Sequence, residues 1–181
     1  MTEQVVEAEN NSINASPTKG LFISMLTHDL VLKDAIGDLV DNSVDGAHRV
    51  KGDDNYDGLC IKIEIKEDYF CIIDNCGGIS IDLARDYVFR FGRPEEMPST
   101  DHSIGQFGIG MKRALFQLGS CFEIESKSNK SYFVVKVNVD DWKINDKWEF
   151  EFDKMERYKD EVPELERYTK ITVTSLYPKQ V

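Results

Sequence analysis

Six short segments with β-strand patterning constrain the fold of this chain more than any other feature. Two of them, 59–65 and 69–74, are separated by three polar residues and predict a hairpin. Four more follow Gly119, and they read CFEIESK, SYFVVKVNV, KWEFEF and TKITVTSL. Because turns and a short acidic insert connect these four segments, we expect strands that pair mainly with antiparallel neighbours.

Helical patterning lies before and between the strand segments. Apolar residues recur at helical spacing from Ser24 to about Val50 and predict one or two helices. A short helix is expected over 83–91 and another from about 108 to Leu118. This order predicts an α+β fold, a two-layer sandwich in which helices cover one face of a mixed, mainly antiparallel sheet.

The remaining organisation is simple. Residues 1–20 are polar and predict a disordered N-terminal arm, and residues 21–181 are expected to form one domain. The four cysteines include no Cys-x-x-Cys pair and do not cluster with histidine, so we expect no zinc site.

The charge balance restricts the partners. With 22 Lys+Arg against 33 Asp+Glu, the formal net charge is -11, which repels nucleic-acid phosphates and anionic lipid headgroups. We therefore expect no direct nucleic-acid binding by this domain. No apolar run approaches the roughly 20 residues of a membrane span, and the first residues lack the pattern of a signal peptide. These features indicate no membrane association and a cytoplasmic protein.

An acidic segment within the first helical region is the first candidate site. Spacings of three and four residues place Asp38, Asp41, Asn42 and Asp45 on one side of a helix. Like charges at this spacing cost about 0.2–0.5 kcal/mol per pair. The segment can be an ordinary solvated face, or its carboxylate and amide can supply the hard oxygen ligands that Mg²⁺ prefers.

The second candidate follows the hairpin, where Asp74 ends an apolar run and the sequence continues Asn-Cys-Gly-Gly-Ile. An Asp at a strand end can accept a hydrogen bond from an exocyclic amine. The glycines that follow let a flat ring approach the backbone. The alternative is an ordinary turn after a hairpin.

The third candidate is a glycine-rich loop, GQFGIGMKR, at residues 105–113, which leads directly into the predicted helix ALFQL. Free amides at a helix start, the positive end of the helix dipole and a nearby ammonium together form a phosphate cradle. The spacing matches neither the Walker A loop nor the Gly-x-Gly-x-x-Gly dinucleotide motif. Tight helix packing can explain Gly108 or Gly110 singly, but it does not explain the whole set.

Taken in order, the segments DLVDNSVD, DNCGGI and GQFGIGMKRA resemble the three nucleotide-binding boxes of the GHKL superfamily. This superfamily includes the ATPase domains of DNA gyrase B, heat-shock chaperones, histidine kinases and MutL. The stretch RYTKIT at 167–172 resembles its last box, in which a Gly-Thr pair opens a strand. The glycine box is most similar to the chaperone-like and MORC-like subgroups. The resemblance spans Asp38 to Leu176 and implies a Bergerat-type ATP-binding fold.

The resemblance implies a role for each matching residue. Asp38 stands at the position of the general base, and Asn42 matches the residue that holds Mg²⁺. Asp74 would receive the adenine amino group, and Thr169 would reach the adenine directly or through water. The further nucleotide-binding positions are Asp45, Gly78 beside the ring, and Gly105, Phe107, Gly108, Gly110, Met111 and Lys112 around the phosphates.

Three residues depart from the family pattern. Asp38 is one methylene shorter than the usual Glu, and a misplacement of ~1 Å can cost about 10²-fold in rate. Cys76 replaces a glycine and Tyr168 replaces the glycine before Thr169, so both are expected to alter the shape of the adenine pocket. The stretch 92–103 occupies the place of the family's ATP lid.

The implied function is an ATP-binding domain that hydrolyses Mg-ATP, slowly or with a partner, to drive a conformational or dimerisation switch. Relatives carry a following transducer domain that supplies a Lys to the γ-phosphate, so we expect such a domain or a protein partner, and a nucleotide-dependent homodimer. Two alternatives stay open: a nucleotide-gated interaction module with little hydrolysis, and a protein kinase of the histidine-kinase or anti-sigma type. No paired helices with a phosphoacceptor His precede the domain, which argues against the kinase.

Overall fold

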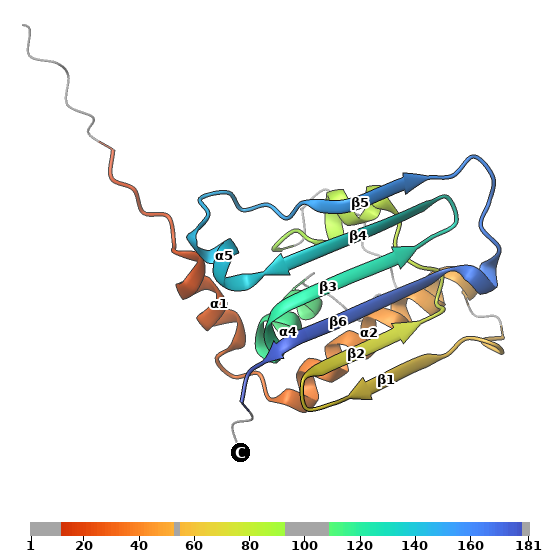
Figure 1. Cartoon of the computed structure of the whole chain (residues 1–181), viewed down its shortest axis with the longest axis horizontal. Coiled ribbons are helices and arrows are strands. Elements are labelled where there is room, and N and C mark those ends of the chain that lie inside the picture. Colours follow the sequence, from red (N-terminus) through yellow and green to blue (C-terminus); the bar gives the residue numbers. More distant parts are fainter. Residues whose placement is uncertain (1–11, 53–54, 93–108, 179–181) are drawn as a thin grey trace, which may run out of the picture.

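The computed structural model describes residues 12–52, 55–92 and 109–178. Its strands form one sheet in the order β1-β2-β6-β3-β4-β5, and all five neighbouring pairs among these described strands are antiparallel (Figure 1). The strands are β1 (Ile61–Ile65), β2 (Tyr69–Asp74), β3 (Gly119–Lys127), β4 (Ser131–Asn138), β5 (Phe152–Arg157) and β6 (Tyr168–Leu176). The predicted hairpin is confirmed as β1 and β2. Strand β6 pairs with β2 on one side and with β3 on the other, and so joins the hairpin to the rest of the sheet.

Helices cover one face of this sheet, with α2 and α4 lying behind the strands in Figure 1. The helices are α1 (Lys19–Thr27), α2 (Leu32–Lys51), α3 (Ile81–Leu83), α4 (Gly110–Leu118) and α5 (Val139–Ile144). A π-helical turn, η1 (Ala84–Val88), continues α3, and a 3-10 turn, η2 (Glu164–Glu166), precedes β6. The predicted α+β two-layer sandwich is confirmed.

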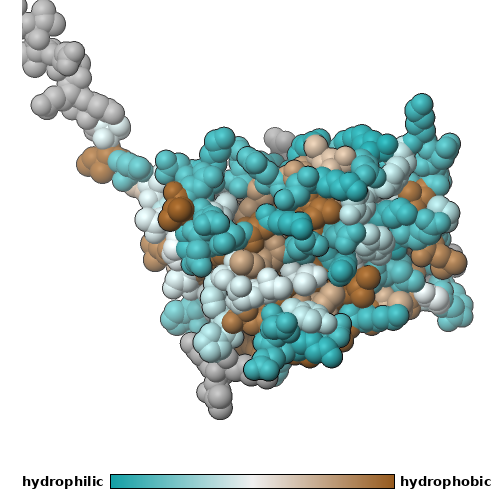
Figure 2. Space-filling view, viewed as in Figure 1, coloured by the Kyte–Doolittle hydropathy of each residue, from teal (hydrophilic) through white to brown (hydrophobic). Residues whose placement is uncertain are grey.

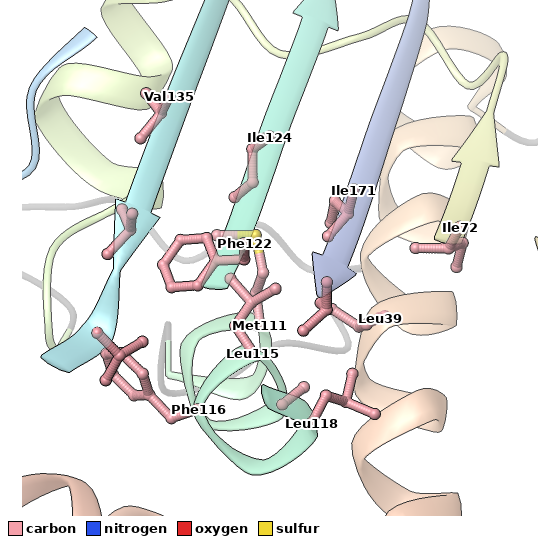
Figure 3. Close-up of a cluster of buried hydrophobic side chains, with 14 of the residues drawn as sticks. Leu39, Ile72, Met111, Leu115, Phe116, Leu118, Phe122, Ile124, Val135 and Ile171 are labelled. Atoms are coloured by element: carbon pink, nitrogen blue, oxygen red, sulfur yellow. The ribbon is translucent and has the colours of Figure 1, made fainter. Parts of the chain in front are cut away.

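The hydrophobic core lies between these two layers, and Figure 3 shows strand side chains meeting the helices there. Ile124 of β3 and Ile171 of β6 lie on the inner face of the sheet and are almost fully buried. They pack in one cluster with Leu39 of α2 and with Met111 and Leu115 of α4. This shared packing fixes α2 and α4 against the same face of the sheet.

The segment KWEFEF does not form the strand that its alternation predicts. Strand β5 begins at Phe152, while Trp148 and Phe150 lie outside the ladder. The Asp153 carboxylate accepts the backbone N–H of Lys136 at 2.7 Å, next to a bulge in the β4–β5 pairing. The Asp153 side chain therefore occupies the Lys136 N–H, which a longer β4–β5 ladder would have bonded to a backbone carbonyl.

The aromatic side chains of that segment instead complete a cluster beside helix α5, which the sequence patterns did not predict. Phe150 lies 5.3 Å from Trp142 and 6.0 Å from Phe122, measured between ring centroids. Asn138 caps α5 by accepting the backbone N–H groups of Asp140 and Asp141. The alternating aromatic residues of this segment therefore belong to the connection between α5 and β5, and their rings pack against the core.

The N-terminal helix α1 is tied to the same cluster by a buried lysine. The Lys19 ammonium donates to the carbonyls of Trp142 at 2.8 Å and Lys147 at 2.6 Å, and also to that of Asn145. It lies 4.3 Å from the centroid of the Trp142 ring, a cation–π contact. Of the arm expected at residues 1–20, residues 1–11 lie outside the described part of the chain, and the last two belong to α1.

The opposite face of the sheet carries no described helix, and Figure 2 shows a mosaic of hydrophilic and hydrophobic residues on it. Outward-facing ion pairs account for part of its polar surface, such as the one in which Lys136 Nζ lies 2.7 Å from Glu123 Oε2. Among the described residues, no helix combines the length and the apolar character needed to cross a membrane.

Candidate functional site

A pocket opens between α2, α4 and the ends of β2 and β6. It brings together residues from all four of the sequence motifs, because both helices pack on the strands that carry the other lining residues. Four of the predicted site residues line it, namely Asn42, Asp74, Met111 and Thr169. Its other lining residues include Ser43, Gly46, Arg49, Cys76 and Ile79.

Asp74 is the polar centre of this pocket. It is the last residue of β2 and only 7% exposed. The Ser43 hydroxyl donates to its Oδ2 at 2.7 Å, and the backbone N–H of Cys76 donates to its Oδ1 at 2.8 Å. Burial raises the pKa of Asp74, and these two hydrogen bonds oppose that shift. The carboxylate is therefore held in a fixed orientation by both α2 and the turn after β2.

Thr169 lies directly across from Asp74 in the pairing of β2 with β6. It is also the register partner of Ser126 on β3, whose Oγ lies 3.2 Å from the Thr169 Oγ1. Ser126 is fully buried, and its Oγ accepts the backbone N–H of Ile79 at 2.8 Å. The sequence patterns did not predict a role for Ser126. Its position two residues after Ile124 places it on the same, inner face of β3, which could have indicated that it faces the site.

The turn after Asp74 packs closely on its neighbours at two glycines. Gly78 has a φ of +69°, and a Cβ there would lie 2.1 Å from the backbone oxygen of Lys127. On the other side, a Cβ on Gly46 of α2 would lie 2.8 Å from the backbone oxygen of Cys76. The guanidinium of Arg49 donates to the Gly78 carbonyl at 3.3 Å. The DNCGG segment is thus clamped between α2 and β3, which gives Gly78 a packing role besides the predicted one.

The two departures expected to reshape the adenine pocket differ in outcome. Cys76 does line the pocket and is 3% exposed, and burial raises the pKa of its thiol to about 11. It therefore presents a neutral thiol at neutral pH. The expectation for Tyr168 is wrong, because its hydroxyl donates to Glu125 at 2.6 Å on the outer face of the sheet. Successive residues of a strand point to opposite faces, so Tyr168 points away when Thr169 faces the pocket.

Asp38 is engaged in a two-pronged ion pair. The Arg113 Nε donates to Asp38 Oδ2 at 2.6 Å, and Nη2 donates to Oδ1 at 3.1 Å. The Asp38 side chain is 18% exposed and that of Arg113 36%. This pairing raises the pKa of Arg113. The candidate base is thus reachable from solvent, but both of its oxygens accept hydrogen bonds from one guanidinium.

One turn further along α2, Asn42 presents an amide at the pocket. Its Nδ2 donates to the backbone oxygen of Asp38 at 2.6 Å, so Oδ1 is the atom that can ligate a cation. Within the described residues, no three His, Cys, Asp or Glu side chains converge as a metal site. The donor set therefore suits an ion that takes most of its ligands from water and phosphate, as Mg²⁺ does. Asp45 lies half-buried on the same helix, close enough to Arg49 for electrostatic interaction.

The start of α4 supplies the remaining predicted residues. Gly110 is its first residue and lies against Asp38, where a Cβ would be 3.5 Å from the Asp38 Cγ. Lys112 is only 3% exposed, and its ammonium donates to the Val88 carbonyl at 2.8 Å, away from the residues that line the pocket. Burial lowers the pKa of Lys112 to about 8. Gly105, Phe107 and Gly108 lie outside the described residues, as does most of the lid expected at 92–103.

The fold and the pocket define a nucleotide-binding domain, with a buried carboxylate at a strand end and a helix start beside it. A sequence model of the family described as Histidine kinase-, DNA gyrase B-, and HSP90-like ATPase matches residues 30–172. The chain belongs to this family, the GHKL superfamily, and is an ATP-binding domain of it. A search of curated proteins finds no match.

Proposed function

We propose that this domain binds Mg-ATP in the pocket around Asp74 and hydrolyses it slowly. The observation that carries the proposal is the buried Asp74 carboxylate, oriented by Ser43 and Cys76 and placed opposite Thr169. A buried carboxylate needs hydrogen-bond donors, and an adenine amino group is a donor of suitable size for a site at a strand end.

In this proposal, different elements of the fold bind different parts of the nucleotide. Asp74 and Thr169 hold the adenine edge, and the amides at the start of α4 face the phosphates. Asn42 would hold the magnesium ion, which when bound neutralises charge on the phosphates. Asp38 would accept a proton from the water that attacks the γ-phosphorus, a general-base role for which it must be released from Arg113.

The ion pair of Asp38 supports a second candidate, a nucleotide-gated interaction module with little hydrolysis. Both oxygens of the Asp38 carboxylate already accept hydrogen bonds from Arg113, so neither is free to contact an attacking water while this pair persists. We propose that nucleotide state drives a conformational or dimerisation switch in either case, together with a transducer domain or a protein partner. We further propose a cytoplasmic setting, where ATP is available.

The metal assignment predicts the behaviour of Asn42→Ala. In the unmodified domain, Mg²⁺ should strengthen ATP binding, and in Asn42→Ala this strengthening should fall at least about tenfold, because a protein oxygen ligand is lost. Calorimetric titration of ATP with Mg²⁺ and with chelator measures both affinities. Asn14→Ala, at an exposed position before α1, is the control and should keep the full Mg²⁺ dependence. Full Mg²⁺ dependence in Asn42→Ala would contradict the assignment.

A further inference from the structure

Arg113 occupies a position that is unfavourable for a cation unless an anion is close. It is the fourth residue of α4, in the first turn, where the positive end of the helix dipole disfavours a guanidinium. It is 36% exposed and is paired with Asp38, and Asp34 of the same α2 face adds further negative potential. These acidic groups stabilise the guanidinium there. Neither Asp38 nor Arg113 lines the pocket, but Asp38 lies on α2 one turn before Asn42, which does.

The spacing along α2 relates Arg113 to the ligand. Ser43 contacts Asp74 and therefore marks the adenine end. Asp38 lies five residues earlier, which is roughly 7.5 Å along the helix axis at 1.5 Å per residue. Asn42 lies between these two levels, at the position proposed for the metal. A nucleotide with its base at Ser43 and its phosphates along α2 would bring its terminal phosphate toward Asp38 and Arg113.

Two other cations among the described residues near the site bind backbone carbonyls. Arg49 donates to the Gly78 carbonyl at the adenine end, and Lys112 donates to the Val88 carbonyl. A terminal phosphate close to Asp38 would meet like charge. Among the described residues, Arg113 has its guanidinium beside Asp38, where the terminal phosphate would lie. Its planar guanidinium can bind phosphate through two hydrogen bonds, as it binds carboxylate.

We propose that Arg113 senses the γ-phosphate: it pairs with Asp38 when no γ-phosphate is present and exchanges this carboxylate for the γ-phosphate when ATP binds. The exchange is one of hydrogen bonds, with no covalent change, and it leaves the Asp38 carboxylate free to accept a proton. ADP lacks the γ-phosphate and leaves the ion pair in place. The inference rests on the proposed function, because it requires that ATP occupies the pocket.

The test compares ATP and ADP binding in an Arg113→Gln variant, using titration calorimetry with Mg²⁺ and a non-hydrolysable ATP analogue. We expect the affinity for the ATP analogue to fall about tenfold or more, since a charged hydrogen bond is lost, while the affinity for ADP changes less than about twofold. Arg113→Lys should recover part of the difference because it keeps the charge and loses the fork.

The control is Arg157→Gln, because Arg157 forms a similar two-pronged ion pair with Asp82 at 3.1 and 2.5 Å, outside the pocket. It should leave both affinities unchanged. Equal weakening of ATP analogue and ADP in Arg113→Gln, or no weakening of either, would overturn the sensor role while leaving the proposed function intact. If the unmodified domain binds neither nucleotide, the proposed function itself fails, and the inference fails with it.

Discussion

Replacing Asp38 by Asn is expected to slow ATP hydrolysis by about 10²- to 10⁴-fold, the usual contribution of a general base. The variant removes the proton acceptor but keeps the size and position of the side chain beside Gly110. ATP affinity should be retained or strengthened, because an amide competes less well than a carboxylate for Arg113. Phosphate release under saturating Mg-ATP measures the rate, and calorimetry measures the affinity.

Asp82→Asn serves as the matched control for this variant. Asp82 also accepts two hydrogen bonds from an arginine, Arg157, but it lies outside the pocket, so its replacement should leave phosphate release unchanged. An Asp38→Asn variant that hydrolyses ATP at the unmodified rate would show that Asp38 is not the base. Asp38→Glu separates two causes of slow turnover. A gain in rate indicates that the shorter side chain limits catalysis, and the absence of a gain points to a missing partner.

Asp74→Asn should weaken ATP binding by about 100-fold. An Asn side chain carries a donor nitrogen in place of one acceptor oxygen, so it can no longer accept hydrogen bonds at both positions from Ser43, the Cys76 backbone N–H and the adenine amino group. Losing one charged hydrogen bond and creating one unpaired donor costs on the order of 3 kcal/mol together. Calorimetric titration of ATP against the variant and the unmodified domain measures the change.

The fold of Asp74→Asn must be checked separately, because Asp74 is buried and bonded to Ser43. Thermal unfolding followed by circular dichroism shows whether the variant is folded at the titration temperature. Ser43→Ala provides a graded comparison, since it removes one hydrogen bond to Asp74 but keeps the carboxylate, and it should weaken ATP binding by about tenfold or less. Unchanged ATP affinity in folded Asp74→Asn would show that Asp74 does not bind the adenine.

Local patterns were sufficient to predict the elements whose signals lie within a few residues. The β1–β2 hairpin and the start of α4 near Gly110 follow from strand alternation and from a glycine-rich stretch before an apolar run. The same patterns fail where alternation has another cause. The aromatic residues of KWEFEF alternate because they pack beside Trp142, while Asp153 takes the Lys136 N–H that a longer β4–β5 ladder would have used.

The candidate site shows the same division. Asn42, Asp74, Met111 and Thr169 carry motif signals, and the structure brings all four to one pocket. Ser43 and Arg113 were missed as participants, because their importance comes from partners distant in sequence: Asp74 is 31 positions from Ser43, and Asp38 is 75 from Arg113. Tertiary packing creates these contacts, and no spacing within one segment encodes them.

The most direct test of the central claim, that this pocket binds adenine nucleotide, is titration calorimetry of the unmodified domain with ATP and with GTP in the presence of Mg²⁺. We expect saturable binding of ATP and at least about tenfold weaker binding of GTP, whose base presents a carbonyl instead of an amino group to the Asp74 carboxylate. Equal affinity for the two nucleotides, or no binding of ATP, would contradict this claim.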